Sequence, residues 1–350
     1  MKEKELSPFI PNEVGMKSTD LSAYLPGIFN ELTAVGKFTA LHTYTSTLNS
    51  FTRFWGKKDT AMPLVEVFTP GTLKTYQEWL VRKGLSWNTV STYMRTLRAI
   101  YNRIFSLISS AASNSAPVFY YNPKLFEDVY TRVESRTKRA LTEKKTQILM
   151  NADLQSLPEK QRRSLAYFRL MFLFRGMPFI DLAHLRKCDL QGNQIVYCRH
   201  KTGRQLTVSI PKEAFALIRE FRDMNPNSIY LFPILDNSLK DSYAQYRNYL
   251  DTLRSFNKYL SKATRILLPG NKVSSYTARH TWATLSFHMG TPVGVISKAL
   301  GHSSIRVTET YLKPFENISV DRANDKLIAL LIQKEDKCRN VGKKLINRFL

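Results

Sequence analysis

Hydrophobic residues recur every three or four positions in three stretches of the first third of the chain, which is the spacing that places them on one face of a helix. These stretches are residues 41 to 55, 70 to 83 and about 87 to 104. Thr69 is suited to cap the start of the second stretch, and Gly84 ends it. The pattern predicts a small helical domain over residues 36 to 110.

Breaker residues mark off this helical domain on both sides. Proline and glycine punctuate residues 1 to 35, which predicts an irregular leader. On the other side, residues 109 to 123 are small, polar and interrupted by proline. A domain boundary therefore falls there, with a linker over residues 111 to 139.

A second domain is predicted over residues 140 to 335, followed by a tail at 336 to 350. Thr142 is suited to cap its first helix. Residues 195 to 200 and 205 to 210 have strand character around a Lys-Thr-Gly-Arg turn, which predicts a hairpin. Helical patterns fill most of the remainder, at about 159 to 175, 212 to 223, 241 to 264, 277 to 289, 293 to 300 and 319 to 334. The expected fold is mostly α with a small antiparallel β-sheet.

The net charge of the chain predicts a binding partner. Lys and Arg number 52 against 28 Asp and Glu, so the formal net charge is +24 and the isoelectric point is about 9.9. Such an excess favours a polyanion, and double-stranded DNA is the expected one. On the predicted helix 87 to 104, Arg95, Arg98 and Asn102 lie opposite the hydrophobic face and are candidates for contact with the DNA backbone; a solvated surface is the alternative.

Cofactor and compartment are constrained by what the sequence lacks. The three cysteines, Cys188, Cys198 and Cys338, form no CxxC pair, and the six histidines form no HExxH pair. No phosphate-binding GxxxxGK[ST] loop, secretory signal or apolar run near ~20 residues is present. We expect a cytoplasmic protein with no cofactor, no metal and no membrane partner.

Two blocks in the last quarter carry the chemistry: SYTARHTWAT, which contains Arg279, and LGHSSIRVTETY, which runs from Leu300 to Tyr311. A tyrosine can exchange one phosphodiester for another because a covalent ester conserves the bond energy. Arginines must stabilise the extra negative charge of the pentavalent phosphorus. With Arg279 upstream and Tyr311 nine residues after His302, the chain resembles the tyrosine recombinase (phage integrase) family.

This resemblance implies a DNA strand-exchange enzyme in which Tyr311 attacks a phosphodiester, forms a 3′-phosphotyrosyl link and releases a 5′ hydroxyl. Arg279 would bind the phosphate, and His302 would bind it or assist proton transfer. Lys201, at the predicted hairpin tip, would protonate the leaving 5′ oxygen, and His280 would have a supporting role. The resemblance also implies a SAM-like core-binding domain before the catalytic domain and a homotetramer on synapsed DNA sites.

The sequence departs from the family pattern at two positions. Tyr276 stands where the family usually has His, and Pro178 stands where it has its first arginine, in the block RGMPFIDL. We expect Arg175 to supply the missing guanidinium from a shifted backbone position. One alternative is a salt bridge from Arg175 to Asp181, whose carboxylate is otherwise suited to orient an arginine. The other is that Arg186, Arg199 or Arg204 compensates for the missing arginine.

These departures leave two functions open, a site-specific recombinase and a catalytically impaired, recombinase-like DNA-binding protein. A type IB topoisomerase would use similar residues on one duplex, and few clustered carboxylates disfavour a metal-dependent transposase. Integration, inversion and resolution share one chemistry. The predicted helix 319 to 334, with Leu327, Leu330 and Leu331 as its apolar stripe, would pack on its own domain or dock into a neighbouring protomer.

Overall fold

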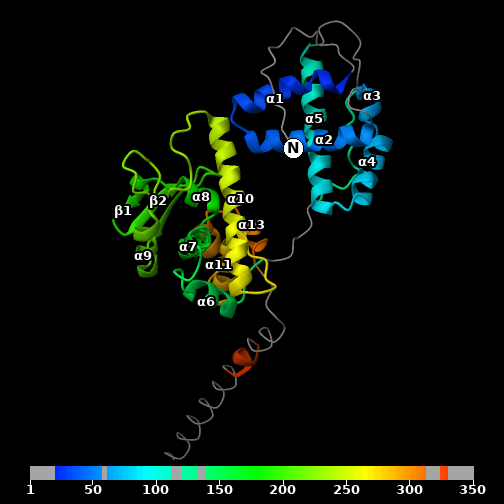
Figure 1. Ribbon diagram of the computed structural model, residues 1–350. Coiled ribbons are helices and arrows are strands. Elements are labelled where there is room, and N and C mark those ends of the chain that lie inside the picture. Colours follow the sequence, from blue (N-terminus) through cyan, green and yellow to red (C-terminus); the bar gives the residue numbers. More distant parts are fainter. Residues whose placement is uncertain (1–19, 57–60, 112–119, 133–138, 313–323, 330–350) are drawn as a thin grey trace, which may run out of the picture. The chain divides into compact units, whose positions relative to one another are not determined.

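The computed structural model describes residues 20–56, 61–111, 120–132, 139–312 and 324–329 (Figure 1). The chain divides into two compact units. Unit 1 contains residues 1–136 and 241–246, and unit 2 contains residues 137–240 and 247–350. The predicted tail at 336 to 350 and much of the predicted leader and linker lie outside the described residues.

Unit 1 is helical throughout its described elements. The three predicted helices are present, and a fourth long helix precedes them. The elements are a 3₁₀ helix η1 (Leu21–Ala23), α1 (Leu25–Ala34), α2 (Phe38–Trp55), α3 (Leu64–Val67), α4 (Pro70–Arg82) and α5 (Trp87–Ala111). Helix α4 begins as expected, because Thr69 Oγ1 accepts a hydrogen bond of 3.1 Å from the backbone N–H of Thr72. The hydrophobic faces of these helices meet in one core.

The prediction of an irregular leader is wrong for residues 25 to 34, which form α1. Pro26 lies in the first turn of this helix, where its missing N–H leaves no hydrogen bond unmade. Ile28 and Leu32 are buried in the core of unit 1. The Pro-Gly pair therefore starts a helix rather than breaking one.

The prediction of a linker is wrong for residues 120 to 132, which fold back onto unit 1. Leu125, Phe126 and Val129 are buried in its core. The backbone N–H of Asn122 donates a hydrogen bond of 2.6 Å to the Tyr101 hydroxyl. These contacts extend unit 1 beyond the end of α5.

Unit 2 combines helices with one three-stranded sheet, as the fold-class prediction expects. Its helices are α6 (Glu143–Asn151), α7 (Glu159–Leu173), α8 (Phe179–His184), a 3₁₀ helix η2 (Lys187–Asp189), α9 (Lys212–Phe221), α10 (Ser242–Leu267), α11 (Ser275–His288), α12 (Val293–Leu300) and α13 (Ile305–Glu309). The first residues of α10, up to 246, belong to unit 1. The strands β1 (Leu190–Gln191), β2 (Gln194–Cys198) and β3 (Gln205–Ser209) are antiparallel, in the order β1-β2-β3. Thr142 caps α6 through a hydrogen bond from the Lys145 N–H.

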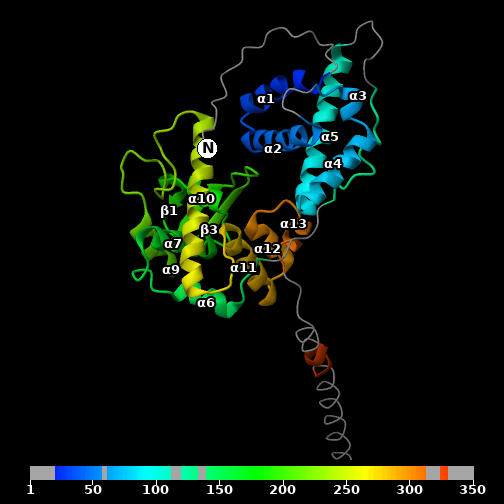
Figure 2. The same cartoon turned by 45° about the vertical axis from the view of Figure 1, so that its right-hand side comes forward.

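The β2–β3 hairpin is the part of the sheet that matters for the site. Its strands pair from Gln194 opposite Ser209 to Cys198 opposite Gln205, and the predicted turn joins them. Figure 1 shows the sheet and α9 on one side of α7 and the long helix α10 on the other. Figure 2 shows α11, α12 and α13 gathered at one end of the unit. The end of β2 and the end of α12 both reach this region, because Arg199, which follows β2, donates a hydrogen bond to the Leu300 oxygen.

Residues 324–329, the described part of the last predicted helix, are helical and exposed. Leu327, the described member of the predicted apolar stripe, is 59% exposed. Leu330 and Leu331 lie outside the described residues. No helix within the described ranges is long and apolar enough to cross a bilayer.

Candidate active site

Arg279 is the buried centre of the site. It lies one turn into α11 and is 3% exposed, and both of its terminal nitrogens donate hydrogen bonds to main-chain carbonyls. Nη1 donates to the Gly176 oxygen at 3.0 Å, and Nη2 donates to the Leu300 oxygen at 2.6 Å. A buried guanidinium with these partners is satisfied and held in one orientation.

The chain approaches Arg279 closely at the end of α7. Arg175 and Gly176 both adopt left-handed backbone conformations, with φ of 59° and 69°. A Cβ at Gly176 would lie 3.0 Å from the Arg279 Cα, which is too close for an unstrained contact. The missing side chain at Gly176 therefore lets its carbonyl reach the guanidinium.

His302 is placed beside Arg279 by the end of α12. Gly301 ends the helix in the left-handed conformation, with φ of 66°. The imidazole Nε2 lies 2.8 Å from Arg279 Nη2, and Nδ1 lies 2.9 Å from Thr308 Oγ1. Because a guanidinium can only donate, Nε2 accepts and the ring proton belongs on Nδ1, where it is donated to Thr308.

This environment keeps His302 neutral. Burial lowers its pKa to about 3, and the positive charges of Arg279, Arg199 and Lys201 act in the same direction. At neutral pH the imidazole therefore carries no charge and keeps a lone pair on Nε2. Sequence reasoning did not identify Thr308, because nothing in its spacing from His302 distinguishes it from other threonines.

Tyr311 lies over the same guanidinium. The Arg279 Cζ is 5.5 Å from the centroid of its ring, and the His302 ring stacks on it at a centroid distance of 5.1 Å. The His280 ring packs against it at 4.7 Å, and Thr284 Oγ1 donates to the Tyr311 carbonyl at 3.2 Å. The structure thus brings together the tyrosine, arginine and late histidine that the sequence singled out, all within one unit of one chain.

Lys201 is exposed at the tip of the β2–β3 hairpin. The tip is closed by hydrogen bonds from the Arg199 N–H to the Arg204 oxygen at 2.9 Å and from the Gly203 N–H to the Arg199 oxygen at 2.8 Å. The charge of Lys201 is close enough to act on the pKa of His302.

Asp181 and Arg199 form a buried ion pair next to the site. Asp181 is 2% exposed and Arg199 is 7% exposed. Arg199 Nε donates to Asp181 Oδ2 at 3.2 Å, and the His200 N–H donates to Oδ1 at 2.9 Å. The carboxylate does orient an arginine, as its position predicted, but the arginine is Arg199.

Arg175 does not join this group. Its Nη1 donates to the Thr207 oxygen at 3.4 Å, and the alternative salt bridge from Arg175 to Asp181 is wrong, because Asp181 pairs with Arg199. Tyr276 is 56% exposed in the first turn of α11 and is accessible to a substrate. On α5, the three predicted DNA-binding residues are all exposed: Arg95, Arg98 and Asn102.

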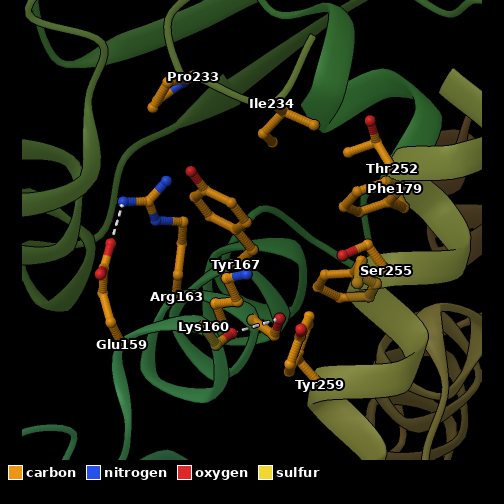
Figure 3. Close-up of a pocket in the computed structure, with 12 residues that line it drawn as sticks. Glu159, Lys160, Arg163, Tyr167, Phe179, Pro233, Ile234, Thr252, Ser255 and Tyr259 are labelled. Carbon is orange, nitrogen blue, oxygen red and sulfur yellow. Dashed lines mark hydrogen bonds and ion pairs between the residues drawn. The ribbon is translucent and has the colours of Figure 1, made fainter. Parts of the chain in front are cut away.

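A separate hollow of about 240 Å³ lies between α7 and α10 (Figure 3). Aromatic rings of Tyr167, Phe179 and Tyr259 line it, together with the cations Lys160 and Arg163. The Tyr167 hydroxyl is buried and has no hydrogen-bond partner among the described residues. This hollow contains none of the residues predicted to be catalytic, and no group of three or more metal-binding side chains occurs within the described ranges.

Comparison with known proteins matches both units. The model of the phage integrase family matches residues 139–317, and the model of the phage integrase SAM-like domain matches residues 20–106. The expectation of a SAM-like domain before a catalytic domain is confirmed. The first match begins at residue 139, two residues after the start of unit 2.

Relatives and solved structures agree with these matches. The chain is 24% identical to transposase B from transposon Tn554 of Staphylococcus aureus, over 81% of this chain and 44% of that protein. It therefore spans less than half the length of this relative. It is also 24% identical to the tyrosine recombinase XerA of Thermococcus kodakarensis, over 75% of this chain and 92% of that protein.

The fold resembles that of a lambda integrase dimer bound to a COC′ core site, with a TM-score of 0.56 and 16% identity over 85% of this chain and 78% of that one. A lambda integrase tetramer bound to a Holliday junction gives a TM-score of 0.55, with 16% identity and the same coverage. The family model covers more than half of the 350 residues, and the residues that carry the resemblance meet around one guanidinium. The chain belongs to the phage integrase family, the tyrosine recombinases.

Proposed function

We propose that this protein is a site-specific DNA recombinase in which Tyr311 is the nucleophile. The observation that carries the proposal is the position of the Tyr311 ring, 5.5 Å from the Arg279 guanidinium carbon and stacked on His302. A phenol beside a buried cation and a neutral imidazole has the groups that attack on phosphorus requires. Double-stranded DNA is the substrate that the net charge of +24 favours.

In the proposed reaction, the phenolic oxygen bonds to the phosphorus and the bond to the 5′ oxygen breaks. Arg279 turns from the carbonyls of Gly176 and Leu300 to the phosphate oxygens, where it stabilises the added charge. Lys201 gives a proton to the departing 5′ oxygen, since an alkoxide leaves poorly. The free 5′ hydroxyl then attacks the phosphotyrosyl bond of a partner duplex and releases Tyr311.

His302 accepts the phenolic proton on Nε2 in this scheme. A pKa of about 3 describes the site without DNA. A phosphodiester beside the imidazole adds a negative charge, which raises the pKa of His302 and makes it a better proton acceptor. Tyr276, exposed three residues before Arg279, is placed to donate a hydrogen bond to the phosphate, and His280 supports the Tyr311 ring.

The relatives support a proposal for the assembly and its setting. Lambda integrase forms a tetramer on a Holliday junction, and the Tn554 relative is a transposase. We propose a homotetramer on two DNA sites, acting in the cytoplasm on the DNA of a mobile element. The exposed basic face of α5 would contact the DNA backbone through Arg95, Arg98 and Asn102.

The test uses DNA chosen by the protein itself. Duplexes bound by the Tyr311→Phe variant are selected from a random pool, and a nick is placed a few nucleotides beyond each possible scissile phosphate, so that cleavage releases a short fragment and traps the covalent complex. The wild-type protein should form a protein–DNA adduct that denaturing electrophoresis detects. Tyr311→Phe should form none while binding the same duplex equally well, because only the hydroxyl is lost.

A second outcome corresponds to the alternative function. If the wild-type protein binds its selected duplex tightly and forms no adduct at any nick position, the protein is a recombinase-like DNA-binding protein without cleavage activity. The sequence at position 178 supports this alternative, because the family has an arginine there and the proline of this chain cannot bind phosphate. A Tyr120→Phe variant, which removes a 75% exposed phenol elsewhere, should cleave like the wild type.

A further inference from the structure

The site lacks one guanidinium at the position where the family has it. Pro178 directly precedes α8 there, and the displaced candidate Arg175 donates to the Thr207 oxygen in β3 rather than to any group around Arg279. A phosphorane carries two negative charges, and one buried arginine leaves part of that charge unmatched. Another cation must therefore be sought among the residues that do surround Arg279.

We propose that Arg199, at the end of β2, binds the scissile phosphate together with Arg279 and replaces the arginine missing at Pro178. This inference rests on the proposed function and names a further catalytic residue of the same site. It is an alternative to the expectation that Arg175 fills the gap.

Arg199 and Arg279 converge on one atom. Arg199 Nη1 donates to the Leu300 oxygen at 2.9 Å, and Arg279 Nη2 donates to the same oxygen at 2.6 Å. The two nitrogens are therefore no farther apart than these two hydrogen bonds laid end to end. The proximity also lowers the pKa of Arg279, after the larger effect of burial. Two guanidiniums that share one carbonyl oxygen can share a phosphate in the same way.

Arg199 is held in this orientation from three sides. Asp181 Oδ2 accepts from Nε at 3.2 Å, and the Gly301 oxygen accepts from Nη1 at 3.2 Å. Its aliphatic part packs on the backbone of Gly301 so closely that a Cβ there would lie 2.7 Å from Arg199 Cδ. A side chain fixed by an ion pair, a carbonyl and packing does not have to be ordered when substrate binds.

One end of the guanidinium remains available. The Arg199 Nη2 group has no hydrogen-bond partner within the described ranges, whereas Nε and Nη1 are both engaged. Among the described residues, Nη2 is not one of the fully buried side-chain atoms without a partner, so it keeps contact with solvent. Its two N–H groups can therefore donate to a phosphate without breaking the contacts that position the side chain.

With Asp181 in place, Arg199 supplies one of the positive charges of the site, and its loss alone would leave a net charge of one. Arg199, Arg279 and Lys201 are three cations that all act on the His302 imidazole, and Asp181 is the one carboxylate paired with them. Their sum is two positive charges, which matches the two negative charges of a phosphorane. Without substrate the buried guanidiniums of Arg199 and Arg279 repel each other, so an anion is favoured between them.

The other two candidate arginines do not share an acceptor with Arg279 in the part of the chain that the structure describes. Arg204 is exposed and donates through Nη1 to the His302 oxygen at 3.0 Å. Arg186 is exposed at the start of η2. Neither shares an acceptor with Arg279 among the described residues.

The experiment compares variants on the nicked duplex selected by the protein, with a normal scissile phosphate and with a methylphosphonate in its place. A methylphosphonate replaces one charged oxygen by a methyl group and so removes the charge that an arginine neutralises. On the normal phosphate, Arg199→Ala should reduce the rate of adduct formation by roughly 10²- to 10³-fold, the usual effect of removing one stabilising donor. Arg199→Lys should reduce it less, because the charge is kept.

Two controls accompany this comparison. Arg219→Ala removes an exposed arginine of α9 and should cleave at a rate close to that of the wild type. Arg175→Ala tests the rival position, and we expect a far smaller loss than for Arg199→Ala. Thermal unfolding and binding of the selected duplex show that each variant is folded, and only folded variants are compared.

The methylphosphonate decides between a catalytic and a structural role. If Arg199 neutralises the phosphate, Arg199→Ala should approach the wild-type rate on the neutral substrate. If Arg199 only holds Asp181 and the end of α12, the variant remains as deficient on the methylphosphonate as on the phosphate, and the proposal is overturned. It is also overturned if Arg175→Ala, rather than Arg199→Ala, is the variant that the neutral substrate rescues.

Failure of the underlying function has a different signature. If the wild-type protein forms no adduct on either substrate, cleavage itself is absent, and the recombinase proposal fails together with the role of Arg199. A wild-type adduct with unimpaired Arg199→Ala removes only the inference about Arg199.

Discussion

Replacing Gly301 by alanine would disturb both the backbone and the arginine that packs against it. Gly301 has a φ of +66°, and an added Cβ would lie 2.7 Å from Arg199 Cδ and 2.9 Å from Leu206 Cδ1. Gly192 is a matched control, because its φ is +58° and a Cβ there would have no atom within 4 Å. The pair separates the cost of the conformation from the cost of the contact.

The magnitude follows from these two costs. A non-glycine residue in the left-handed region costs about 1–2 kcal/mol, and alanine recovers about 0.4–1 kcal/mol by restricting the unfolded chain. Gly192→Ala should therefore lower the free energy of unfolding by about 1 kcal/mol. Gly301→Ala adds overpacking of about 1–3 kcal/mol, for a total of about 2–4 kcal/mol.

Urea denaturation monitored by circular dichroism measures both variants. We also expect Gly301→Ala to cleave nicked DNA more slowly than Gly192→Ala, because the new methyl group can be accommodated only by moving the stem of Arg199. In an Arg199→Ala background the Cδ atom is gone, so Gly301→Ala should destabilise less than it does in the wild type. Equal losses of stability for Gly301→Ala and Gly192→Ala would refute the close contact on which this reasoning depends.

Two further predictions concern His302. Thr308→Val removes the acceptor for the Nδ1 proton and should lower the free energy of unfolding by about 1–3 kcal/mol and slow cleavage. Thr308→Ser keeps an acceptor and should preserve both stability and cleavage. Equal behaviour of the two variants in denaturation and adduct assays would contradict this role of Thr308. The pKa of His302 is about 3 in the folded protein and near 6.5 when unfolded, so the unfolded chain binds the proton first as pH falls. The stability that His302 contributes should be complete above pH 6.5 and decline toward pH 3, by at most ~1.4 kcal/mol per pH unit. A His302→Gln variant whose free energy of unfolding depends on pH as in the wild type would contradict this prediction.

Local patterns predicted the elements whose signals are themselves local. Helix α12 has the predicted bounds of 293 to 300, because Pro292 and Gly301 mark its ends in the sequence. The β2–β3 hairpin was also visible, since alternating residues flank a glycine turn. Tyr311, Arg279 and His302 were found because their spacing resembles a known family.

What the sequence could not supply depends on contacts between distant residues. Leu125, Phe126 and Val129 lack helical or strand spacing, so only the surface of unit 1 shows why they are buried. Arg199 stood as one of three compensating candidates, because its link to Leu300 joins residues 101 positions apart. Arg175 was preferred on chain distance from Pro178, yet its left-handed backbone leaves its guanidinium beside Thr207.

The position of Tyr311 within the site of its own chain has a genetic consequence. The phenol and the guanidinium it lies over come from the same unit, so neither is lent by a neighbouring copy. A cell that carries one allele without the tyrosine and another without Arg279 would hold no complete site in any mixed assembly. For the proposed recombinase we therefore expect no intragenic complementation between two such alleles.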